Sequence, residues 1–328
     1  MKIVLILCDA LRADRITPGI MPNLFNLAEK SAYFPMFFAD GGATAWSMPF
    51  FLCGQKEYDP DNTFPGALTK AGIHNSLIHS NAVLKVEQER DTQKLKPYEQ
   101  CFKEYLDTGV ELDPIKVGLR NRFRKSKLWS KTRLFRKALL GHQMIDIPYR
   151  RASTILNYAQ LKLDEQDSGF WWVHLMDPHI PYCPPGLDEY EKKRANELYE
   201  YVLRTVHGNH NFTKTEVNDL IEFYNRECTY MDEQIINFIN ANKDCLFIIT
   251  SDHGEMFGET HSFSHGAYYH GMTLQLGHIP FFVYKEGMTD KIIFDYHSSV
   301  DIAPTILDIF GLNPSFGYGR SMKEDLHL

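Results

Sequence analysis

The stretch Leu246-Phe247-Ile248-Ile249-Thr250-Ser251-Asp252-His253-Gly254-Glu255 joins an apolar run to a polar turn. Its first five residues are large or β-branched, a composition typical of a buried strand. The Asp252-His253 pair that follows can point a carboxylate oxygen and an imidazole nitrogen at one cation, and Gly254 permits a sharp turn. This stretch therefore predicts a buried strand with candidate metal ligands at its carboxyl end. With no ligand, the same turn would be a hydrogen-bonded loop.

Other short apolar runs alternate along the chain with helix-like stretches. The runs are residues 3–8, 76–79, 170–175 and 279–284, and the helix-like stretches include residues 21–29 and 217–239. This alternation predicts a doubly wound α/β fold with a mostly parallel central sheet. Ligands of such folds bind at the carboxyl ends of the strands, which is where Asp9, Asp177 and His179 follow their runs.

Composition places the chain among ordinary globular proteins. Its 328 residues are 44% hydrophobic, enough for one large domain or for a core with an insertion. A net charge of −7 argues against general nucleic-acid affinity. The six cysteines lack metal-site or disulfide-framework spacing, so we expect reduced thiols.

The first residues resemble the start of a signal peptide. Asp9 ends the apolar run too early for one, and no stretch approaches the roughly 18 to 20 apolar residues of a membrane helix. We therefore expect a cytoplasmic protein.

Residues 85–168 interrupt the strand pattern with charged, helix-favouring sequence and are expected to form an inserted helical cap. Within them, residues 116–137 carry many lysines and arginines interleaved with apolar residues, and no acidic residue. Such a basic amphipathic helix can lie on an anionic membrane surface or hold a polyanionic substrate. It can equally be a solvated helix whose apolar stripe covers the core.

Two further residues carry candidate chemistry. Asp9 closes a buried strand, where a carboxylate is costly unless it meets a cation or hydrogen-bond donors. Thr44 lies in a glycine-led, hydroxyl-rich turn that opens a helix, where a hydroxyl can be no more than a cap but where anions also bind. If a metal bound by Asp9, Asp252 and His253 also contacts Thr44, the pKa of the threonine falls and its alkoxide can attack phosphorus or sulfur.

The segment Phe170-Trp171-Trp172-Val173-His174-Leu175-Met176-Asp177-Pro178-His179-Ile180-Pro181-Tyr182 resembles the stretch with a substrate-contacting histidine in sulfatases, a family of the alkaline phosphatase superfamily. Further resemblances occur in the family's order at residues 9–14, 22–28, 251–255, 300–308 and 319–321. They imply an alkaline phosphatase-like sandwich, with a catalytic domain over residues 1–322. Residues 85–168 contribute nothing to the resemblance.

The nucleophile position departs from the sulfatase pattern. Sulfatases carry a Cys or Ser, oxidised to formylglycine, ten residues before a Gly, and counting back from Gly54 gives Thr44, with Met48 in place of the arginine. Threonine cannot become that aldehyde. It resembles instead the branch of phosphoethanolamine and phosphoglycerol transferases, lipoteichoic acid synthases and related phosphodiesterases. The tandem Asp-Asp of sulfatases is also reduced here to Asp9-Ala10.

This branch implies a site with one divalent metal, whose expected ligands are Asp9, Thr44, Asp252 and His253. Mn²⁺ or Mg²⁺ is expected and Zn²⁺ also suits the set, whereas an imidazole ligand makes Ca²⁺ less suitable. A second metal would require Asp177, His179 or nearby histidines.

The expected substrate contacts surround this metal. His179 and His270 would stabilise charge in the transition state, and one of them would protonate the leaving oxygen. His265 is nearly as good a match as His270 to the family's later His-Gly element. Asp177 and Arg12 are further candidates for substrate binding, although Arg12 could pair with Asp14 instead.

The sequence thus predicts a metal-dependent hydrolase or transferase acting on a phosphoester of a glycan, lipid or nucleotide through a covalent Thr44 intermediate. Its expected partner is an anionic small-molecule, glycan-linked or lipid-linked ester. One alternative is a sulfate-ester hydrolase without formylglycine, and another is a catalytically silent scaffold. A third is a transferase acting on lipid-linked glycans, in peripheral contact with the inner face of a membrane through residues 116–137. The sequence leaves open the choice between hydrolase and transferase.

Overall fold

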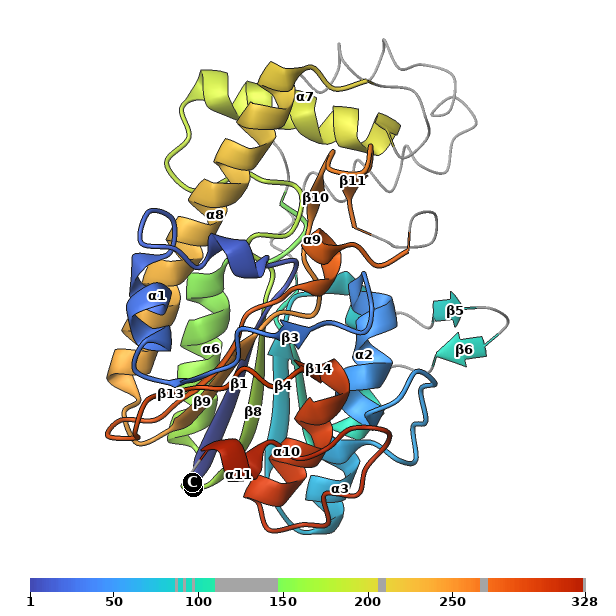
Figure 1. Ribbon diagram of the computed structural model, residues 1–328, viewed down its shortest axis with the longest axis vertical. Helices are drawn as coiled ribbons and strands as arrows, with labels where there is room; N and C mark the ends of the chain where they lie inside the picture. Colours follow the sequence, from blue (N-terminus) through green and yellow to red (C-terminus); the bar gives the residue numbers. More distant parts are fainter. Residues whose placement is uncertain are drawn as a thin grey trace.

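A mixed sheet forms the centre of the computed structural model, which describes residues 1–85, 88–90, 93–95, 98–109, 147–205, 211–265 and 271–326. Within those ranges eight strands pair in the order β13-β2-β12-β9-β1-β8-β4-β7 (Figure 1). Their bounds are β1 Lys2–Cys8, β2 Ala32–Tyr33, β4 Asn75–His79, β7 Glu104–Asp107, β8 Gly169–Leu175, β9 Leu246–Thr250, β12 Phe281–Tyr284 and β13 Lys291–Ile292. The strands β9, β1, β8, β4 and β7 are parallel, which confirms the mostly parallel sheet.

The predicted strand 279–284 differs from the expectation. It begins at Phe281 and runs antiparallel to β9, with Phe281 opposite Thr250. Among the described residues between β9 and β12, 251–265 and 271–280, the helix is the short α9 (Leu274–Gly277), which lies beyond the carboxyl edge of the sheet, and no crossover helix is found. A strand that starts from the edge where its neighbour ended must run in the opposite direction.

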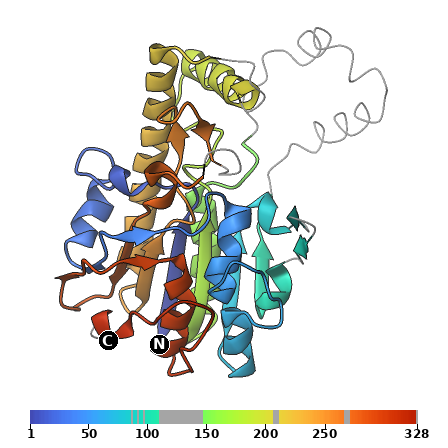
Figure 2. The same cartoon turned by 45° about the vertical axis from the view of Figure 1, so that its right-hand side comes forward.

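Helices cover both faces of the sheet (Figure 2). One layer contains α1 (Pro22–Ala28), α6 (Ala152–Asp164) and α8 (Lys214–Ala241), and the other contains α2 (Thr44–Cys53), α3 (Phe64–Lys70) and α10 (Ile302–Ile309). Because side chains alternate along a strand, β1 sends Val4 and Ile6 into the first core and Ile3 and Leu5 into the second. The doubly wound prediction is therefore confirmed.

The remaining elements are short, apart from α7 (Glu189–Thr205), which lies across α8 beyond the carboxyl ends of the strands (Figure 1). They are β3 Phe37–Phe38, β5 Gln88–Arg90, β6 Gln93–Leu95, β10 Met256–Phe257, β11 Phe263–Ser264, β14 His297–Ser298, α11 Lys323–Leu326, and the 3-10 turns Ala13–Arg15, Ala82–Lys85, Tyr98–Cys101 and Ser299–Asp301.

Two elements within the expected cap, residues 85–168, belong to the central sheet and its helical layer. At one end of that range β7 pairs with β4 as part of the central sheet. At the other end α6 packs on β8 and α8, with its buried side chains in the core. The basic segment 116–137 lies outside the described residues, so its helix stays a prediction.

Two further expectations concern thiols and membranes. All six cysteines are free thiols, as their spacing predicted. Within the described ranges, none of the helices combines the length and the apolar character needed to cross a bilayer.

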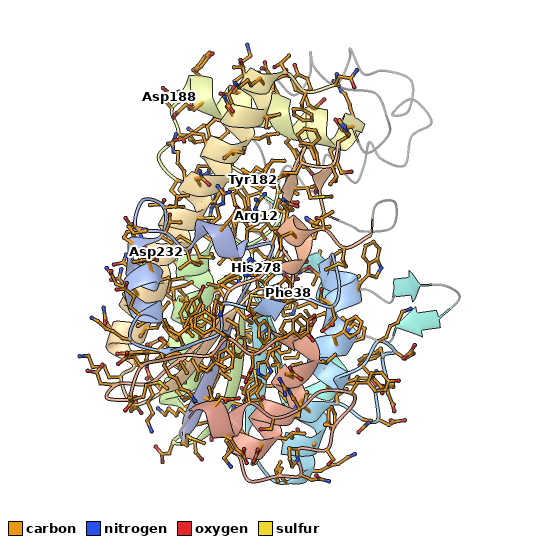
Figure 3. All side chains as sticks on the ribbon, in the orientation of Figure 1. Arg12, Phe38, Tyr182, Asp188, Asp232 and His278 are labelled. Atoms are coloured by element: carbon orange, nitrogen blue, oxygen red, sulfur yellow. The ribbon has the colours of Figure 1, made fainter. Side chains whose placement is uncertain are left out.

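A buried carboxylate on α8 fixes the start of α1. The residue before α1, Met21, makes no side-chain cap. Asp232 takes this role from α8 (Figure 3): its Oδ1 accepts from the Leu24 N–H at 2.7 Å and its Oδ2 from the Asn23 N–H at 3.0 Å. Acceptors at a helix N-terminus satisfy N–H groups that have no partner within the helix.

We expect Asp232→Ala to lower the free energy of unfolding by about 2 kcal/mol, because two buried donors of α1 lose their acceptor. Urea unfolding followed by circular dichroism measures the change. Glu233→Ala, at the neighbouring exposed position, serves as the control and should leave the midpoint unchanged. An equal effect of the two substitutions would contradict the capping role.

Candidate active site

Three potential metal ligands meet at the carboxyl edge of the sheet. Asp9 directly follows β1, and Asp252 and His253 follow the adjacent parallel strand β9, with Leu7 opposite Thr250. This pairing brings the ends of the two strands together, and one ligand atom from each of the three residues lies within 4.8 Å of the others. All three residues are fully buried.

The atoms that face the centre of this cluster have no hydrogen-bond partner. They are Asp9 Oδ1, Asp252 Oδ2 and His253 Nε2. His253 Nε2 lies 3.6 Å from Asp9 Oδ1 and 3.5 Å from Asp252 Oδ2. Buried carboxylate oxygens without donors are costly, and a bound cation removes that cost. One nitrogen and two carboxylate oxygens suit Mn²⁺, Mg²⁺ or Zn²⁺, so the residues fit a divalent metal.

The opposite atoms of two of these ligands are held by the backbone. Asp252 Oδ1 accepts from the N–H groups of Ala10, at 3.3 Å, and His253, at 3.0 Å. His253 Nδ1 lies 2.8 Å from the Gly254 carbonyl oxygen, and a proton on Nδ1 would leave the Nε2 lone pair facing the centre. Gly254 is required here because a Cβ atom would collide with the Gln275 carbonyl oxygen.

The second carboxylate oxygen of Asp9 collects side-chain contacts. Asn81 Nδ2 donates to Asp9 Oδ2 at 2.8 Å, and His174 Nε2 lies 3.0 Å from the same atom. Burial opposes ionisation of Asp9, but His179 and His174 lower the pKa of the carboxyl below its usual range. Asp9 is therefore held as a carboxylate with Oδ1 free for a ligand.

Thr44 opens α2 with its hydroxyl group turned toward this cluster. The hydroxyl donates to Asp9 Oδ2 at 3.2 Å, and the side chain is buried. Ala43, not Thr44, is the residue that caps α2, so the hydroxyl is not a helix cap. The Ser47 hydroxyl donates a hydrogen bond to the Asp252 carbonyl oxygen at 2.8 Å. This bond joins α2 to the turn that carries Asp252 and His253.

Two of the predicted histidines lie beside the cluster. The ring centroids of His179 and His265 are 4.9 Å apart, and those of His265 and His253 are 4.5 Å apart. Burial opposes protonation of His265, but the buried Glu255 carboxylate, 3.1 Å from Nδ1, raises the pKa of His265 to about 9. Burial lowers the pKa of His179. The charged form of the imidazole is therefore favoured at His265 and disfavoured at His179.

Two other predicted contact residues have partners within the protein, and a third lies outside the described residues. Arg12 (Figure 3) is buried and its guanidinium donates to Asp14, Glu259 and the Glu255 carbonyl oxygen. Asp177 is buried as well, and both of its carboxylate oxygens accept hydrogen bonds within the protein. Both side chains are thus engaged in contacts within the protein, and their expected substrate contacts stay predictions. His270 lies outside the described residues, so its role stays a prediction.

Sequence reasoning did not identify several residues of the site. His174 is part of the apolar run that forms β8, and Asn81 follows the predicted strand 76–79 by two residues. Glu255 accepts hydrogen bonds from the Tyr182 hydroxyl at 2.8 Å and lies against His265. A polar residue just beyond a predicted central strand is the signal that could have found Asn81.

The fold and the site together define a member of the alkaline phosphatase-like α/β class. A family model described as Sulfatase matches residues 2–312. The chain therefore belongs to the sulfatase family.

Individual similarities are more distant. An arylsulfatase from Clostridium perfringens is 24% identical over 286 residues, which cover 77% of this chain and 55% of that protein. The chain thus spans little more than half the length of this relative. A phosphonate monoester hydrolase from Silicibacter pomeroyi superposes with a TM-score of 0.65 at 18% identity, covering 99% of this chain and 76% of the other. A lipooligosaccharide phosphoethanolamine transferase from Neisseria meningitidis superposes with a TM-score of 0.66 at 15% identity. The superposition covers 99% of this chain and 57% of the other. The structural similarities show the fold.

We expect Asn81→Ala to weaken divalent metal binding about 10- to 100-fold, because Asp9 loses the donor that orients it. Titration of metal-stripped protein against a chromophoric chelator measures the affinity. Asn62→Ala, at an exposed position before α3, is the matched control and should bind metal like the unaltered protein. Unchanged affinity in Asn81→Ala would show that this hydrogen bond does not prepare the ligand.

Proposed function

We propose that this chain is a metal-dependent enzyme that cleaves or transfers phosphoesters through a covalent Thr44 intermediate. One observation carries the proposal: Thr44, which cannot be converted to formylglycine, places its hydroxyl 3.2 Å from Asp9 beside three buried, unpartnered ligand atoms. Membership of the sulfatase family supports chemistry on sulfate or phosphate esters. The similarity in fold to a phosphonate monoester hydrolase and a phosphoethanolamine transferase is consistent with phosphorus as the reacting atom.

The residues of the site divide the reaction between them. A divalent cation held by Asp9, Asp252 and His253 would lower the pKa of the Thr44 hydroxyl and offset charge on the substrate's phosphoryl oxygens. Thr44 Oγ releases its proton to solvent as it bonds to phosphorus, while the bond from phosphorus to the leaving oxygen breaks. The leaving oxygen takes a proton from His179 or His265. Water or another alcohol then attacks the same phosphorus and gives its proton to the imidazole that lost one. The bond from phosphorus to Thr44 Oγ breaks, and Thr44 takes a proton back from solvent.

The charge balance of the site favours a phosphodiester over a phosphomonoester. The carboxylates of Asp9 and Asp252 offset a divalent cation, and Glu255 offsets cationic His265. Among the described residues, the guanidinium groups of Arg12 and Arg151 already pair with carboxylates. The described residues therefore leave little positive charge for the second charge of a phosphomonoester dianion, whereas a diester carries one negative charge.

Sulfate-ester hydrolysis is the second candidate. A sulfate ester is also a monoanion, so it suits the same charge balance, and the arylsulfatase from Clostridium perfringens is a sequence relative. Thr44 in place of a formylglycine precursor argues against it.

We expect that metal-stripped protein does not hydrolyse bis-(p-nitrophenyl) phosphate, p-nitrophenyl phosphate or p-nitrophenyl sulfate. Addition of a divalent metal should restore turnover, most strongly for the diester. Thr44→Ala should lose about 1000-fold or more in kcat, while Thr44→Ser keeps a hydroxyl nucleophile and substantial activity. Release of p-nitrophenol measures all reactions. Mass spectrometry of denatured protein should find the phosphoryl adduct on Thr44.

The outcomes separate the candidates. Metal-dependent turnover of the sulfate alone would favour the sulfatase candidate. Diester turnover that persists in Thr44→Ala would contradict the covalent intermediate.

A further inference from the structure

The loop that carries His179 is tied down at both ends by one arginine. The loop follows β8 and runs from Asp177 to Cys183. Arg151, the residue before α6, donates through Nη1 to Asp177 Oδ1 at 2.7 Å and through Nη2 to the Cys183 carbonyl oxygen. A guanidinium group offers several donors in a rigid plane, so it can fix the separation of the two ends.

Two neighbours of Arg151 complete this clamp. Glu227 on α8 accepts from Arg151 Nη1 through Oε2 and from the Cys183 N–H through Oε1, at 2.7 Å. The Tyr149 hydroxyl donates to the carbonyl oxygen of His179 itself at 2.9 Å. The loop is therefore anchored to α8 and to the segment that leads into α6, with one contact at the histidine.

The clamp places two carboxyl groups around one guanidinium group in a buried place. Asp177 and Glu227 are both fully buried and face a single guanidinium. Burial and the Asp177 charge, against the effect of Arg151, raise the pKa of Glu227 to about 8. A buried ionic cluster of this kind is weak evidence for a contribution to stability. The cluster of Arg151, Asp177 and Glu227 instead holds the two ends of the loop in one geometry.

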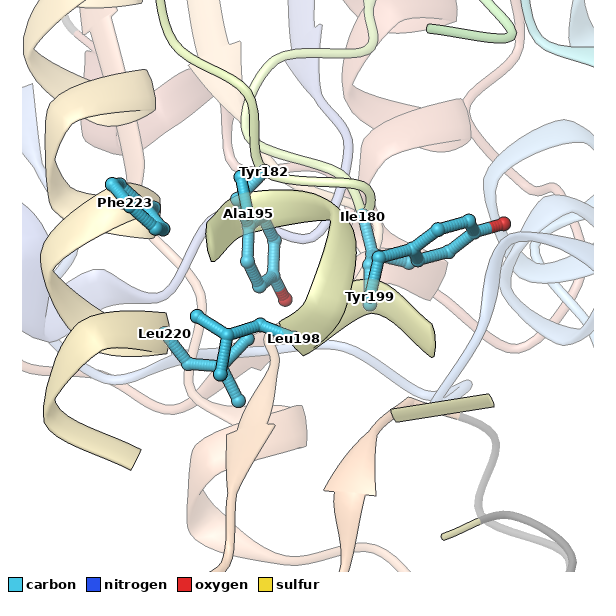
Figure 4. A pocket seen from close by; sticks show the side chains of 7 residues that line it. All are labelled: Ile180, Tyr182, Ala195, Leu198, Tyr199, Leu220 and Phe223. Carbon is cyan, nitrogen blue, oxygen red and sulfur yellow. The ribbon is translucent and has the colours of Figure 1, made fainter. Parts of the chain in front are cut away.

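The other side of the loop is packed against helices. Ile180 and Tyr182 point into an apolar gap between α7 and α8 that leaves no room for a water molecule (Figure 4). The Tyr182 hydroxyl continues to Glu255, the carboxylate that holds His265. The loop is thus held by hydrogen bonds to Arg151, Glu227 and Tyr149 and by apolar packing against α7 and α8. It carries His179, and its Tyr182 is linked through Glu255 to His265.

We propose that Arg151 is a positioning residue that acts through His179, holding this imidazole where it meets the leaving oxygen. The proposal rests on the proposed function, in which His179 is one of the two imidazoles that can protonate that oxygen. The hydrogen bonds of Arg151 go to Asp177, Cys183 and Glu227, and not to the candidate metal ligands or Thr44. Its guanidinium also lies over the Tyr230 ring. A displacement of a catalytic group by about 1 Å can cost about 100-fold in rate, which is the scale of effect expected.

A double-mutant cycle tests this role with metal-loaded protein and bis-(p-nitrophenyl) phosphate. His179→Ala should lower kcat about 100-fold. Arg151→Ala should lower kcat about 10- to 100-fold, with KM and metal affinity unchanged. In the His179→Ala background, Arg151→Ala should have no further effect, because its target is already removed. Guanidinium ion, well below denaturing concentrations, should restore part of the kcat of Arg151→Ala.

A neighbouring arginine and a milder substitution provide the controls. Arg150→Ala should keep unaltered kcat and should not respond to guanidinium. Tyr149→Phe removes the hydroxyl contact with His179 while keeping the buried ring, and it should lower kcat several-fold only when His179 is present. This variant keeps the test open if Arg151→Ala does not fold.

Three outcomes would overturn the role of Arg151. Multiplicative losses in the double variant would show that Arg151 does not act through His179. A loss of metal affinity in Arg151→Ala equal to its loss of kcat would show that Arg151 acts on the metal site instead. Unaltered activity of His179→Ala would remove the acid role on which the inference rests, whereas absent turnover by the unaltered protein would contradict the proposed function itself.

Discussion

The buried carboxylate of Asp9 is the constraint on which the site depends. Its strand lies at the centre of the parallel sheet, so the side chain emerges where water is excluded and where β9 delivers Asp252 and His253. One oxygen is satisfied by the protein, and the other remains available together with two similar atoms. Such an arrangement is stable with a cation and costly without one. The fold therefore brings three candidate metal ligands together at one buried point.

This constraint also explains the place of Thr44. Because α2 begins against the same carboxylate, the threonine hydroxyl lies next to the metal position, and the Ser47 contact keeps the helix in register with the turn. Glu255 holds the His265 imidazole, and Arg151 ties the loop that carries His179. Rigid strands carry the metal ligands, and loops with polar anchors carry the groups that would move protons.

The sequence predicted the parallel strands and their polar ends because a strand's apolar run and the residue after it are local features. Asp9, Asp252 and His253 were found in this way. The antiparallel direction of β12 was not predictable, since it depends on the position of β12 beside β9 in the folded sheet and not on its own apolar run. Arg151 and Asn81 were missed because their partners, Asp177 and Asp9, are distant in sequence. For the same reason, internal pairing of Arg12 with Glu259 was not foreseen.

The most direct test of the metal-centred account is anomalous X-ray diffraction from crystals of the protein grown with Mn²⁺ or Zn²⁺. The account predicts one anomalous peak at coordination distance, roughly 2.0 to 2.3 Å, from Asp9 Oδ1, Asp252 Oδ2 and His253 Nε2, with the Thr44 hydroxyl beside it. It would be contradicted by a protein that binds its metal elsewhere and leaves these three atoms paired with water or with each other.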